Sequence, residues 1–266
     1  MADLVIVFQH AEEYERAARA ITAAGGRFRT VSPPDALADV AAPYLIISDE
    51  SRGALHAVVQ AGAMIAGQVW FRAPLPDAMA DLGPPPPAGS EDVVGRMTIA
   101  FVAPCVAEED HLRLIAQVEK DLAPVMPYLN AVLRGGTFSA AGPTFTYMDG
   151  PRLVNLYPHR VAVARAREMH DAWRTLAKVK RSINDVWSRR QSITPSYERR
   201  VKISALEIFS RLPRTNCRRC GEATCLAFAA KLLNGAQRLE NCAPVFGGEY
   251  ERLRQPLLDL AAGLGL

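Results

Sequence analysis

Four of the five cysteines in this chain of 266 residues lie together near its C-terminal end. They are Cys217, Cys220, Cys225 and Cys242, and their spacing is C-x2-C-x4-C-x16-C. Four thiolates that converge on one point are what an iron–sulfur cluster requires, and they are also what a structural zinc ion requires. The segment around them must therefore fold so that four sulfur atoms meet.

The spacing favours a 4Fe–4S cluster over the alternatives. A cubane cluster has four irons that each need one thiolate, and Cys217-x2-Cys220 lets two sulfur atoms bind neighbouring irons from a tight loop. Gly221 leaves backbone amides free to point toward the inorganic sulfides, which tunes the reduction potential. Zinc stays an alternative, although zinc sites usually pair their cysteines as two C-x2-C units and only one is present here.

The composition is that of an ordinary globular protein. Hydrophobic residues make up 49% of the chain and charged residues 22%. The sequence contains no run of roughly 18 apolar residues that could span a membrane. Its start lacks the basic stretch and long apolar region of a signal peptide. We therefore expect a cytoplasmic protein without membrane contact, in which clustered cysteines favour a metal over disulfides.

The net charge of +3 conceals an uneven distribution. Residues 151–220 carry 17 Lys and Arg against 5 Asp and Glu, a balance of +12, so the other segments together carry −9. Basic residues are thus concentrated in the region that leads into the cysteine segment. We expect an acidic redox protein or metalloenzyme to dock on residues 151–220.

The first 75 residues predict a ferredoxin-like α/β domain, a name that describes a fold and not iron binding. Apolar, β-branched runs alternate with two helical patterns in the order βαββαβ. The predicted strands cover residues 4–8, 27–31, 44–48 and 69–71, and the predicted helices cover residues 11–24 and 51–66, the second with Leu55, Val58, Val59 and Met64 inward. A phosphate-binding glycine loop is missing after the first strand, which argues against a nucleotide site.

A second α/β domain is expected over residues 93–197, after a Pro-rich linker over residues 76–92. Its predicted elements are a strand at 97–102, a helix at 108–122, an irregular stretch at 128–142, a hairpin at 145–157, a strand at 161–164 and a long helix at 168–190. The hairpin turns at Asp149-Gly150, a favoured two-residue turn. The long helix has an apolar stripe with Trp173 and Trp187 and a basic opposite face.

Residues 198–266 are expected to form a small helical cluster domain. A helix over residues 198–212, with Ile203, Leu206, Phe209 and Leu212 inward, delivers the chain to Cys217. A second helix starts at Cys225 and stops at Asn234-Gly235. The chain then returns to place Cys242. The whole chain is therefore predicted to be of the α/β (α+β) class, with this helical domain at its C-terminal end.

The cysteines stand in the run Leu212-Pro-Arg-Thr-Asn-Cys217-Arg-Arg-Cys220-Gly-Glu-Ala-Thr-Cys225-Leu-Ala-Phe-Ala-Ala-Lys. This run resembles the small 4Fe–4S domain of the corrinoid iron–sulfur protein large subunit, and a looser version occurs in the B subunit of Rnf-type electron-transport complexes. The resemblance covers about residues 203–245. It implies that all four clustered cysteines bind the cluster. Cys242-Ala-Pro departs from the Cys-Pro frequent in the family, which leaves this ligand set intact.

The remainder of the chain does not resemble these proteins. It contains no recognisable corrinoid-binding barrel, flavodoxin-like cobalamin domain, N-terminal membrane anchor or second cluster motif. The resemblance therefore implies a cluster domain that passes single electrons to a metallocofactor or partner, and it does not transfer the relatives' activities.

Two further residues are candidates for function. Cys105 follows the predicted strand at 97–102 and is either a reactive thiol, an auxiliary metal ligand or a buried core residue. His159, in Tyr157-Pro-His-Arg160, is either a metal or anion ligand or a packed loop residue. The other histidines, His10, His56, His111 and His170, lack ligand spacing. Because the sequence shows no catalytic motif, an accessory or electron-transfer role is favoured over an enzymatic one.

The sequence thus predicts a 4Fe–4S protein that transfers one electron to a partner metalloenzyme, or matures or reactivates that enzyme. The alternative hypothesis is a cluster-dependent regulatory or nucleic-acid-binding protein whose cluster is structural. The basic stretch with Trp173, Trp187 and Tyr197 supports this second hypothesis. Core packing of these aromatic residues would weaken it.

Overall fold

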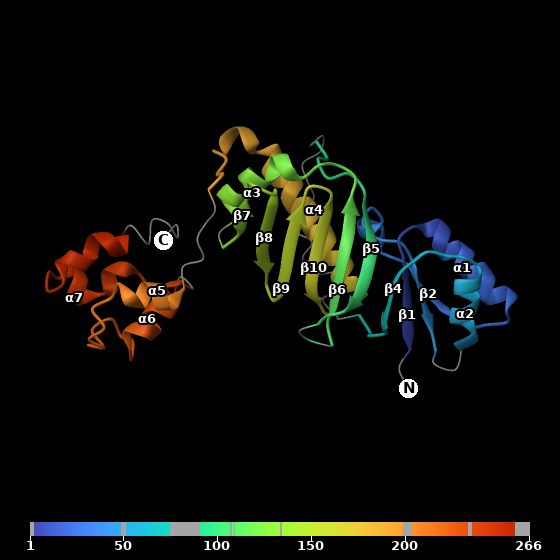
Figure 1. Ribbon diagram of the computed structural model, residues 1–266, viewed down its shortest axis with the longest axis horizontal. Helices are drawn as coiled ribbons and strands as arrows, with labels where there is room; N and C mark the ends of the chain where they lie inside the picture. The colour runs from blue at the N-terminus through green and yellow to red at the C-terminus, as the bar shows by residue number, and fades with distance from the viewer. Residues whose placement is uncertain are drawn as a thin grey trace. The chain divides into compact units, whose positions relative to one another are not determined.

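The computed structural model describes residues 3–48, 52–74, 91–106, 108, 110–133, 135–198, 204–233 and 236–258. The chain forms two compact units, an N-terminal unit over Met1–Glu198 and a C-terminal unit over Arg199–Leu266. The fold is mixed α/β with two antiparallel sheets (Figure 1). Most of the predicted linker, Ile203 and the predicted helix stop at Asn234-Gly235 lie outside the described residues.

The first sheet is four-stranded and lies in the N-terminal unit. Its strands and the helices between them are β1 (Leu4–Phe8), α1 (Ala11–Ala23), β2 (Arg29–Val31), β3 (Tyr44–Ile47), α2 (Arg52–Gln60) and β4 (Ile65–Trp70), with a 3-10 turn η1 (Asp35–Leu37) after β2. The strand order across the sheet is β2-β3-β1-β4, and each strand is antiparallel to its neighbours. The elements follow one another in the predicted order.

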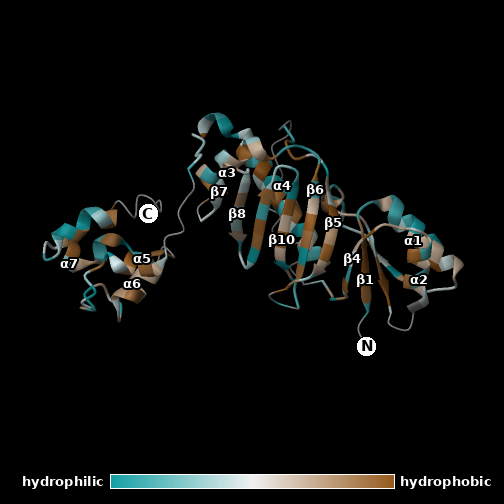
Figure 2. Cartoon of the chain, in the orientation of Figure 1, coloured by the Kyte–Doolittle hydropathy of each residue, from teal (hydrophilic) through white to brown (hydrophobic). Residues whose placement is uncertain are grey.

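This first sheet is buried on both faces, which explains why its central strands are continuous apolar runs. Alternate side chains of a strand point to opposite faces. Ile6 and Phe8 pack with Ile21 and the other core residues beneath α1 and α2. Val5 and Val7 belong instead to a larger core that includes the second sheet. Figure 2 shows the resulting concentration of hydrophobic residues in the strands.

The predicted helix over residues 51–66 is wrong at its C-terminal end. Gly62 adopts φ +64, the left-handed conformation that commonly follows the last turn of a helix. Val59 and Met64 were expected to face inward, and both are 59% exposed. Gly67, the residue after the predicted helix, lies inside β4 at φ +156.

The second sheet is six-stranded, with strand order β5-β6-β10-β9-β8-β7 and antiparallel neighbours (Figure 1). Its elements are β5 (Met97–Pro104), β6 (Leu112–Val118), α3 (Met126–Val132), β7 (Thr137–Ser139), β8 (Thr144–Asp149), β9 (Arg152–Tyr157), β10 (Arg160–Ala166) and α4 (Met169–Ser188). The predicted hairpin between β8 and β9 is present, but its two-residue turn is Gly150-Pro151, because Asp149 pairs with Arg152. Gly150 has φ +59.

The predicted helix over residues 108–122 is wrong, because strand β6 occupies this segment. Its apolar residues also recur at helical spacing, which supported the helix prediction. In the structure the buried side chains alternate with more exposed ones, the period of a strand with one buried face. The buried ones are Leu112, Leu114, Ala116 and Val118. Residues 128–142, expected to be irregular, contain most of α3 and all of β7.

Helix α4 covers one face of the second sheet and also reaches the first sheet. The predicted apolar stripe is confirmed, since Trp173, Leu176, Val179 and Ile183 are buried. The Trp173 ring lies 5.2 Å from the ring of Tyr44 on β3, measured between centroids. Residues of both sheets and of α4 therefore form one continuous core.

The start of α4 is fixed by buried carboxylates. Glu168 accepts hydrogen bonds from the backbone N–H groups of His170 and Asp171, as an N-cap residue does. Asp171 pairs with Arg152 of β9 and with Arg174. Burial alone would raise the pKa of Asp171, but these arginines and the Arg167 backbone N–H lower it. The pairing joins β9 to the helix that covers it.

Asp92 joins the segment before β5 to α4. Its Oδ1 accepts hydrogen bonds from Asn184 and from the N–H groups of Val94 and Gly95, each at 3.0 Å, and its Oδ2 lies 3.0 Å from Lys180 Nζ. Burial alone would raise the pKa of Asp92. The hydrogen bonds outweigh this effect and lower the pKa to about 2.

We expect Gly67→Ala to destabilise the N-terminal unit by about 2–4 kcal/mol, because a Cβ there would lie 2.0 Å from the Val102 carbonyl oxygen of β5. Trp fluorescence during urea unfolding is a suitable probe, since all three tryptophans lie in this unit. Gly53→Ala is the matched control, because a Cβ at Gly53 meets nothing within 4 Å. Equal unfolding midpoints for the two variants would contradict the close approach of β4 and β5.

We expect the N-terminal unit to lose stability as the pH falls from about 4 toward about 2. The folded-state pKa of Asp92 is lowered, so its contribution is complete above the unfolded pKa of about 3.9 and is lost through the folded pKa. The Asp92 side chain is 45% exposed, so solvent screening limits the contribution to about 1 kcal/mol. Urea midpoints measured against pH should show a shallower acid dependence in Asp92→Asn than in the wild type.

Candidate metal centre

The four clustered cysteines line a single pocket of the C-terminal unit. This unit is formed by helices α5 (Ala205–Ser210), α6 (Cys225–Leu233) and α7 (Ala243–Phe246) and the loops between them. Its core consists of Ile208, Leu212, Phe228, Ala229, Leu232, Leu239, Cys242, Val245 and Leu257. Of the predicted inward residues, Leu212 is buried and Phe209 is half-buried, whereas Leu206 is 65% exposed because α5 turns Ile208 inward instead.

The exposure of the cysteines changes from one side of the pocket to the other. Cys217 is exposed, Cys220 and Cys225 are half-buried, and Cys242 is buried. All four are free cysteines. Burial raises the pKa of the Cys242 thiol, and the charges of Cys225, Cys220 and Cys217 raise it further. The other three cysteines are therefore close enough to Cys242 to oppose its ionisation, which a bound cation would relieve.

The sulfur atoms are nevertheless spread apart. Within the described parts of the chain, no three cysteine sulfurs lie within 4.8 Å of one another. Four thiolates on one tetrahedral zinc ion would stand about 3.8 Å apart, given Zn–S bonds of about 2.3 Å. A cluster with four irons is bound at four separate corners and holds its thiolates farther apart. The spacing thus suits a cluster better than a single ion.

The loop that carries the first two cysteines has an unusual backbone. Arg214, Asn216 and Arg218 have φ values of +59, +49 and +60, and Gly221 has φ +83. Non-glycine residues rarely adopt this left-handed region, at a cost of about 1 kcal/mol or more each. Alternation of left-handed and right-handed residues turns successive N–H groups to one side, a concavity typical of anion and iron–sulfur sites.

Asn216 links this loop to helix α6. Its Oδ1 accepts a hydrogen bond of 2.8 Å from the backbone N–H of Cys225, the first residue of the helix. Thr224 caps the same helix end, because its Oγ1 accepts from the Ala227 N–H at 3.0 Å. Asparagine also tolerates positive φ better than most residues. One side chain thus holds the loop conformation and the position of the third cysteine.

A second polar link joins Cys220 to the segment that leads to Cys242. Gln237 Nε2 donates to the carbonyl oxygen of Cys220 at 3.2 Å and to Glu222 Oε1 at 2.9 Å. Lys231 of α6 also donates to Glu222, which is buried. These hydrogen bonds from Lys231 and Gln237 lower the pKa of Glu222, so its charge is balanced within the wall of the pocket.

Cys105 and His159, the other candidates from the sequence, do not join this site. Cys105 lies in the N-terminal unit just after β5 and is buried. His159 is exposed in the turn between β9 and β10, and its carbonyl oxygen accepts from Val118 N. Their positions support core packing for Cys105 and a loop role for His159.

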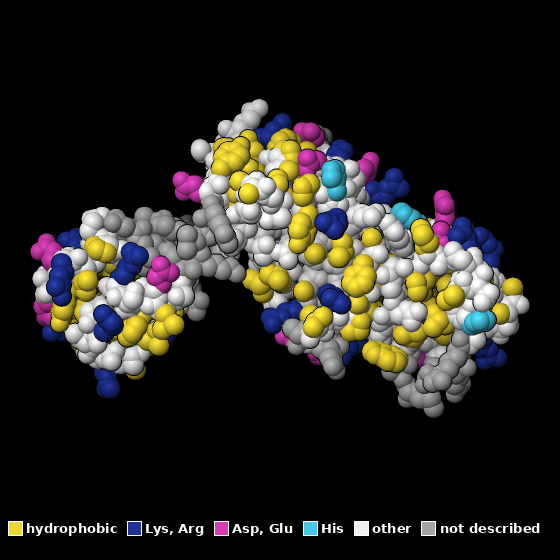
Figure 3. All heavy atoms as spheres, viewed as in Figure 1, with side chains coloured by type: hydrophobic (Ala, Val, Ile, Leu, Met, Phe, Trp, Pro, Cys, Tyr) yellow, Lys and Arg dark blue, Asp and Glu magenta, His cyan; other side chains and the backbone are white. Residues whose placement is uncertain are grey.

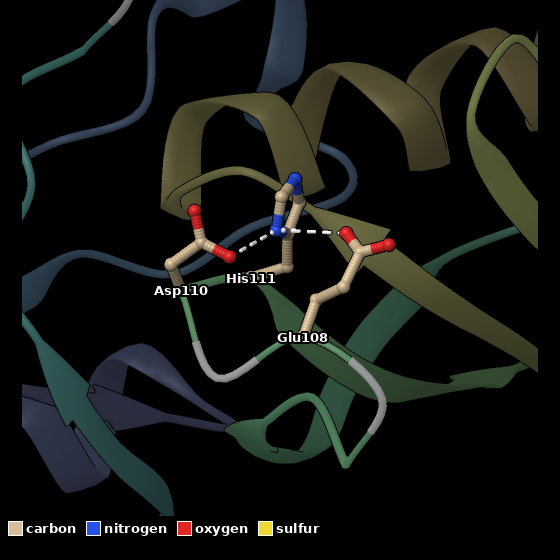
Figure 4. Close-up of side chains that lie close together, drawn as sticks. All are labelled: Glu108, Asp110 and His111. Carbon is tan, nitrogen blue, oxygen red and sulfur yellow. Dashed lines mark hydrogen bonds and ion pairs between the residues drawn. The ribbon is translucent and has the colours of Figure 1, made fainter.

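The structure also shows a cluster that sequence reasoning missed. In Figure 4 the His111 ring lies between two carboxylates, with Nδ1 3.1 Å from Glu108 and 2.8 Å from Asp110. The near-adjacent acidic residues in Glu108-x-Asp110-His111 were the available signal. Arg165 pairs with Glu108 at 3.3 Å, and Arg72 lies 3.8 Å from Asp110. The cluster is therefore explained as a network of ion pairs.

The N-terminal unit also contains a hollow of about 480 Å³ between its two sheets, lined by residues that include His10, Asp39 and Glu119. Lys180 and Asp92 face this hollow and are paired with each other. The Glu119 carboxylate accepts from the Arg96 N–H at 2.9 Å. Its main charged groups thus already serve the structure of the unit.

Comparison with known proteins identifies the C-terminal segment. A family model described as "Putative Fe-S cluster" matches residues 212–244. These residues include all four clustered cysteines and all the residues that line the pocket. The C-terminal unit therefore contains an iron–sulfur cluster domain.

Curated relatives match the same end of the chain. The acetyl-CoA decarbonylase/synthase complex subunit gamma of Methanosarcina acetivorans is 50% identical over 71 residues, and that of Methanocaldococcus jannaschii is 37% identical over 59 residues. The corrinoid/iron-sulfur protein large subunit of Moorella thermoacetica is 37% identical over 69 residues. These matches cover 23%, 22% and 24% of this chain.

The similarity is confined to the cluster domain. The matched part spans only 15%, 12% and 16% of the length of these three relatives. No solved structure matches the chain. Among the described residues, no helix is both long and apolar enough to cross a membrane.

We expect Asn216→Ala to lose iron to a chelator faster than the wild type, because it removes the bond to Cys225 N–H and disfavours positive φ. Losing this hydrogen bond, which caps the first residue of α6, should cost about 1–2 kcal/mol of local stability. Asn216→Gly retains the backbone freedom without the cap and should lie between the two. Asn216→Asp retains the cap and is the matched control. Indistinguishable rates of iron release from the alanine and aspartate variants would contradict this role.

Proposed function

We propose that this protein binds a 4Fe–4S cluster through Cys217, Cys220, Cys225 and Cys242 and uses it to pass single electrons. The recipient would be a partner metalloenzyme, either in turnover or during its maturation or reactivation. The observation that carries this proposal is the convergence of four cysteines on one pocket. Among the described residues no three of their sulfur atoms lie within 4.8 Å of one another, a wider spacing than the distance of about 3.8 Å in a tetrahedral zinc site.

The residues around the pocket support a redox-active site. The cluster would supply a one-electron couple whose potential depends on hydrogen bonds to its sulfurs and on exclusion of water. The chain offers both. The loop at 214–221 contains four left-handed residues, a backbone feature of the N–H concavities that bind anions and iron–sulfur clusters. Phe228 lines the pocket and is buried, and Leu232 is buried in the core of the same unit.

The names of the relatives support a metalloenzyme partner. Two are subunits of an acetyl-CoA decarbonylase/synthase complex, and one is a corrinoid/iron-sulfur protein. For this chain the shared part is the cluster domain alone. For this chain we therefore propose electron delivery to a metal-containing partner. We leave aside the relatives' own reactions and assemblies.

The N-terminal unit would recognise the partner. We retain the ferredoxin-like assignment for residues 1–75 and the second α/β module for residues 93–197 as part of this proposal, although they share core residues. The element order βαββαβ and the strand order β2-β3-β1-β4 support the first assignment.

Nucleic-acid binding is a second candidate, favoured by one observation on the face of the second sheet that α4 does not cover. There the Arg113 guanidinium stacks over Phe101 at 5.5 Å and the Arg160 guanidinium over Tyr157 at 5.3 Å. Such stacked pairs also bind unpaired bases. The tryptophans of α4 support this candidate less, because Trp173 is buried. A gel shift with single-stranded oligonucleotides, with and without the cluster, tests it.

We expect anaerobic reconstitution to give about four irons and four sulfides per chain, with a paramagnetic resonance signal that appears after one-electron reduction. Serine at Cys217, Cys220, Cys225 or Cys242 should lower the iron content and change this signal. Cys105→Ala is the matched control and should retain both, since Cys105 lies in the other unit. Stoichiometric zinc without iron after anaerobic purification would contradict the proposal.

A further inference from the structure

The pocket has one exposed side, which lies at Cys217. Cys242 is only 7% exposed and belongs to the core of the unit, whereas Cys217 is exposed to solvent. The residues on both sides of it, from Arg214 to Arg219, are exposed as well. Electron exchange with another molecule requires close approach to the redox centre. A partner can approach most closely at Cys217.

Arg214 and Arg218 flank Cys217 in the chain, and Arg218 lines the pocket. Both are exposed and available to such a partner. Within the described parts of the chain, neither Arg214 nor Arg218 forms an ion pair or side-chain hydrogen bond. Neighbouring cations of the same unit are engaged, since Arg219 pairs with Glu249 at 2.6 Å and Lys231 pairs with Glu222. Figure 3 shows Lys and Arg side chains among apolar ones on the visible face of this unit.

The predicted basic region thus divides into two parts with different properties. In the N-terminal unit, most of its cations are already neutralised by carboxylates. The pairs are Arg152 and Arg174 with Asp171, Lys178 with Asp149, Lys180 with Asp92, Arg189 with Asp185 and Arg190 with Glu91. The free positive charge is therefore better developed beside Cys217 than along α4.

The backbone at these two arginines has an unusual conformation. Both occupy left-handed positions in the strained loop, with Cys217 between them in the chain. Strain of this kind persists where the surrounding structure over-determines it, commonly at functional sites. Glycine would have avoided the strain, so the presence of two long cationic side chains requires a separate reason.

We propose that Arg214, Cys217 and Arg218 form the rim through which this protein exchanges electrons, and that this rim accepts an acidic surface of a partner protein. The inference rests on the proposed function, because it assumes a redox-active cluster behind the rim. A second copy of the chain is disfavoured as the occupant, since two cationic rims would repel each other.

Small redox complexes of opposite charge test the rim without knowledge of the partner. The reduced holoprotein is mixed anaerobically with tris(oxalato)cobaltate(III), an anion, or with hexaammineruthenium(III), a cation. Each metal complex gains the one electron that the protein loses, and no bond to the protein forms. We expect the rate with the anion to fall as ionic strength rises and the rate with the cation to increase.

The double variant Arg214→Asn, Arg218→Asn removes the charge but keeps residues that tolerate positive φ. We expect its rate with the anion to fall about tenfold at low salt, and its rate with the cation to increase. Lysine at both positions should restore the wild-type rates. The matched control is Arg19→Gln with Arg27→Gln, which removes two exposed charges from the other unit and should have little effect.

Anion binding at the rim is measured with tris(oxalato)chromate(III), a redox-inert anion of the same shape. It should inhibit oxidation by the cobalt anion competitively in the wild type and weakly in the asparagine variant. The midpoint potentials of the wild type and the asparagine variant should stay close. Equal losses of rate in the asparagine variant and the Arg19/Arg27 control would overturn the rim. The proposal would also be overturned if a single-stranded oligonucleotide inhibited oxidation by the cobalt anion more strongly than an acidic polypeptide such as polyglutamate did.

The failure of the rim and the failure of the proposed function give different results. A protein that cannot be reduced at all, or that contains zinc, contradicts the proposed function. A protein that is reduced reversibly but shows the same salt dependence with both complexes contradicts the rim alone. If the variants do not retain iron, the salt dependences of the wild type still decide, because a rate with the anion that increases with ionic strength would contradict a cationic rim.

Discussion

Four cysteines held so close together that three of them oppose the ionisation of the fourth, Cys242, are the constraint around which the C-terminal unit is organised. A protein core alone gives no reason to hold them together, because burial and mutual repulsion both raise the pKa of Cys242. The unit instead supplies fixed groups around them. Asn216 holds the loop against α6, and Gln237 ties Cys220 to the returning segment. A small helical core thus serves mainly to position ligands for a metal group.

The N-terminal unit is organised differently, because one helix packs against residues of two sheets. One side of α4 packs on the six-stranded sheet, and Trp173 also reaches Tyr44 in the four-stranded sheet. Several cations of this helix are only partly exposed and pair with carboxylates. Asp171, Asp149 and Asp92 pair with Arg174, Lys178 and Lys180. Net charge along a sequence therefore overstates the field that a partner would meet at this surface.

The sequence allowed prediction of those features that depend on local chemistry. Cysteine spacing indicated the metal centre, and Asp149-Gly150 indicated the hairpin of β8 and β9. Both signals come from residues that are close together in the sequence. Strand β6 was missed because its apolar residues satisfy the helical period and the strand period together, and only pairing with β5 and β10 decides between them. The early end of α2 at Gly62 and the shared core similarly depend on contacts distant in sequence. Positive φ at Arg214 and Arg218 could not be predicted, since arginine does not prefer that conformation.

The left-handed arginines have a consequence for the chain before it folds. Glycine at these positions would relieve strain in the folded loop, yet it would also give the unfolded chain more conformations to lose. The two effects have opposite signs, and at positive φ the strain in the folded loop is the larger one. Arginine at these two positions therefore adds positive charge at a net cost to the stability of the domain, and the more restricted unfolded chain offsets only part of that cost.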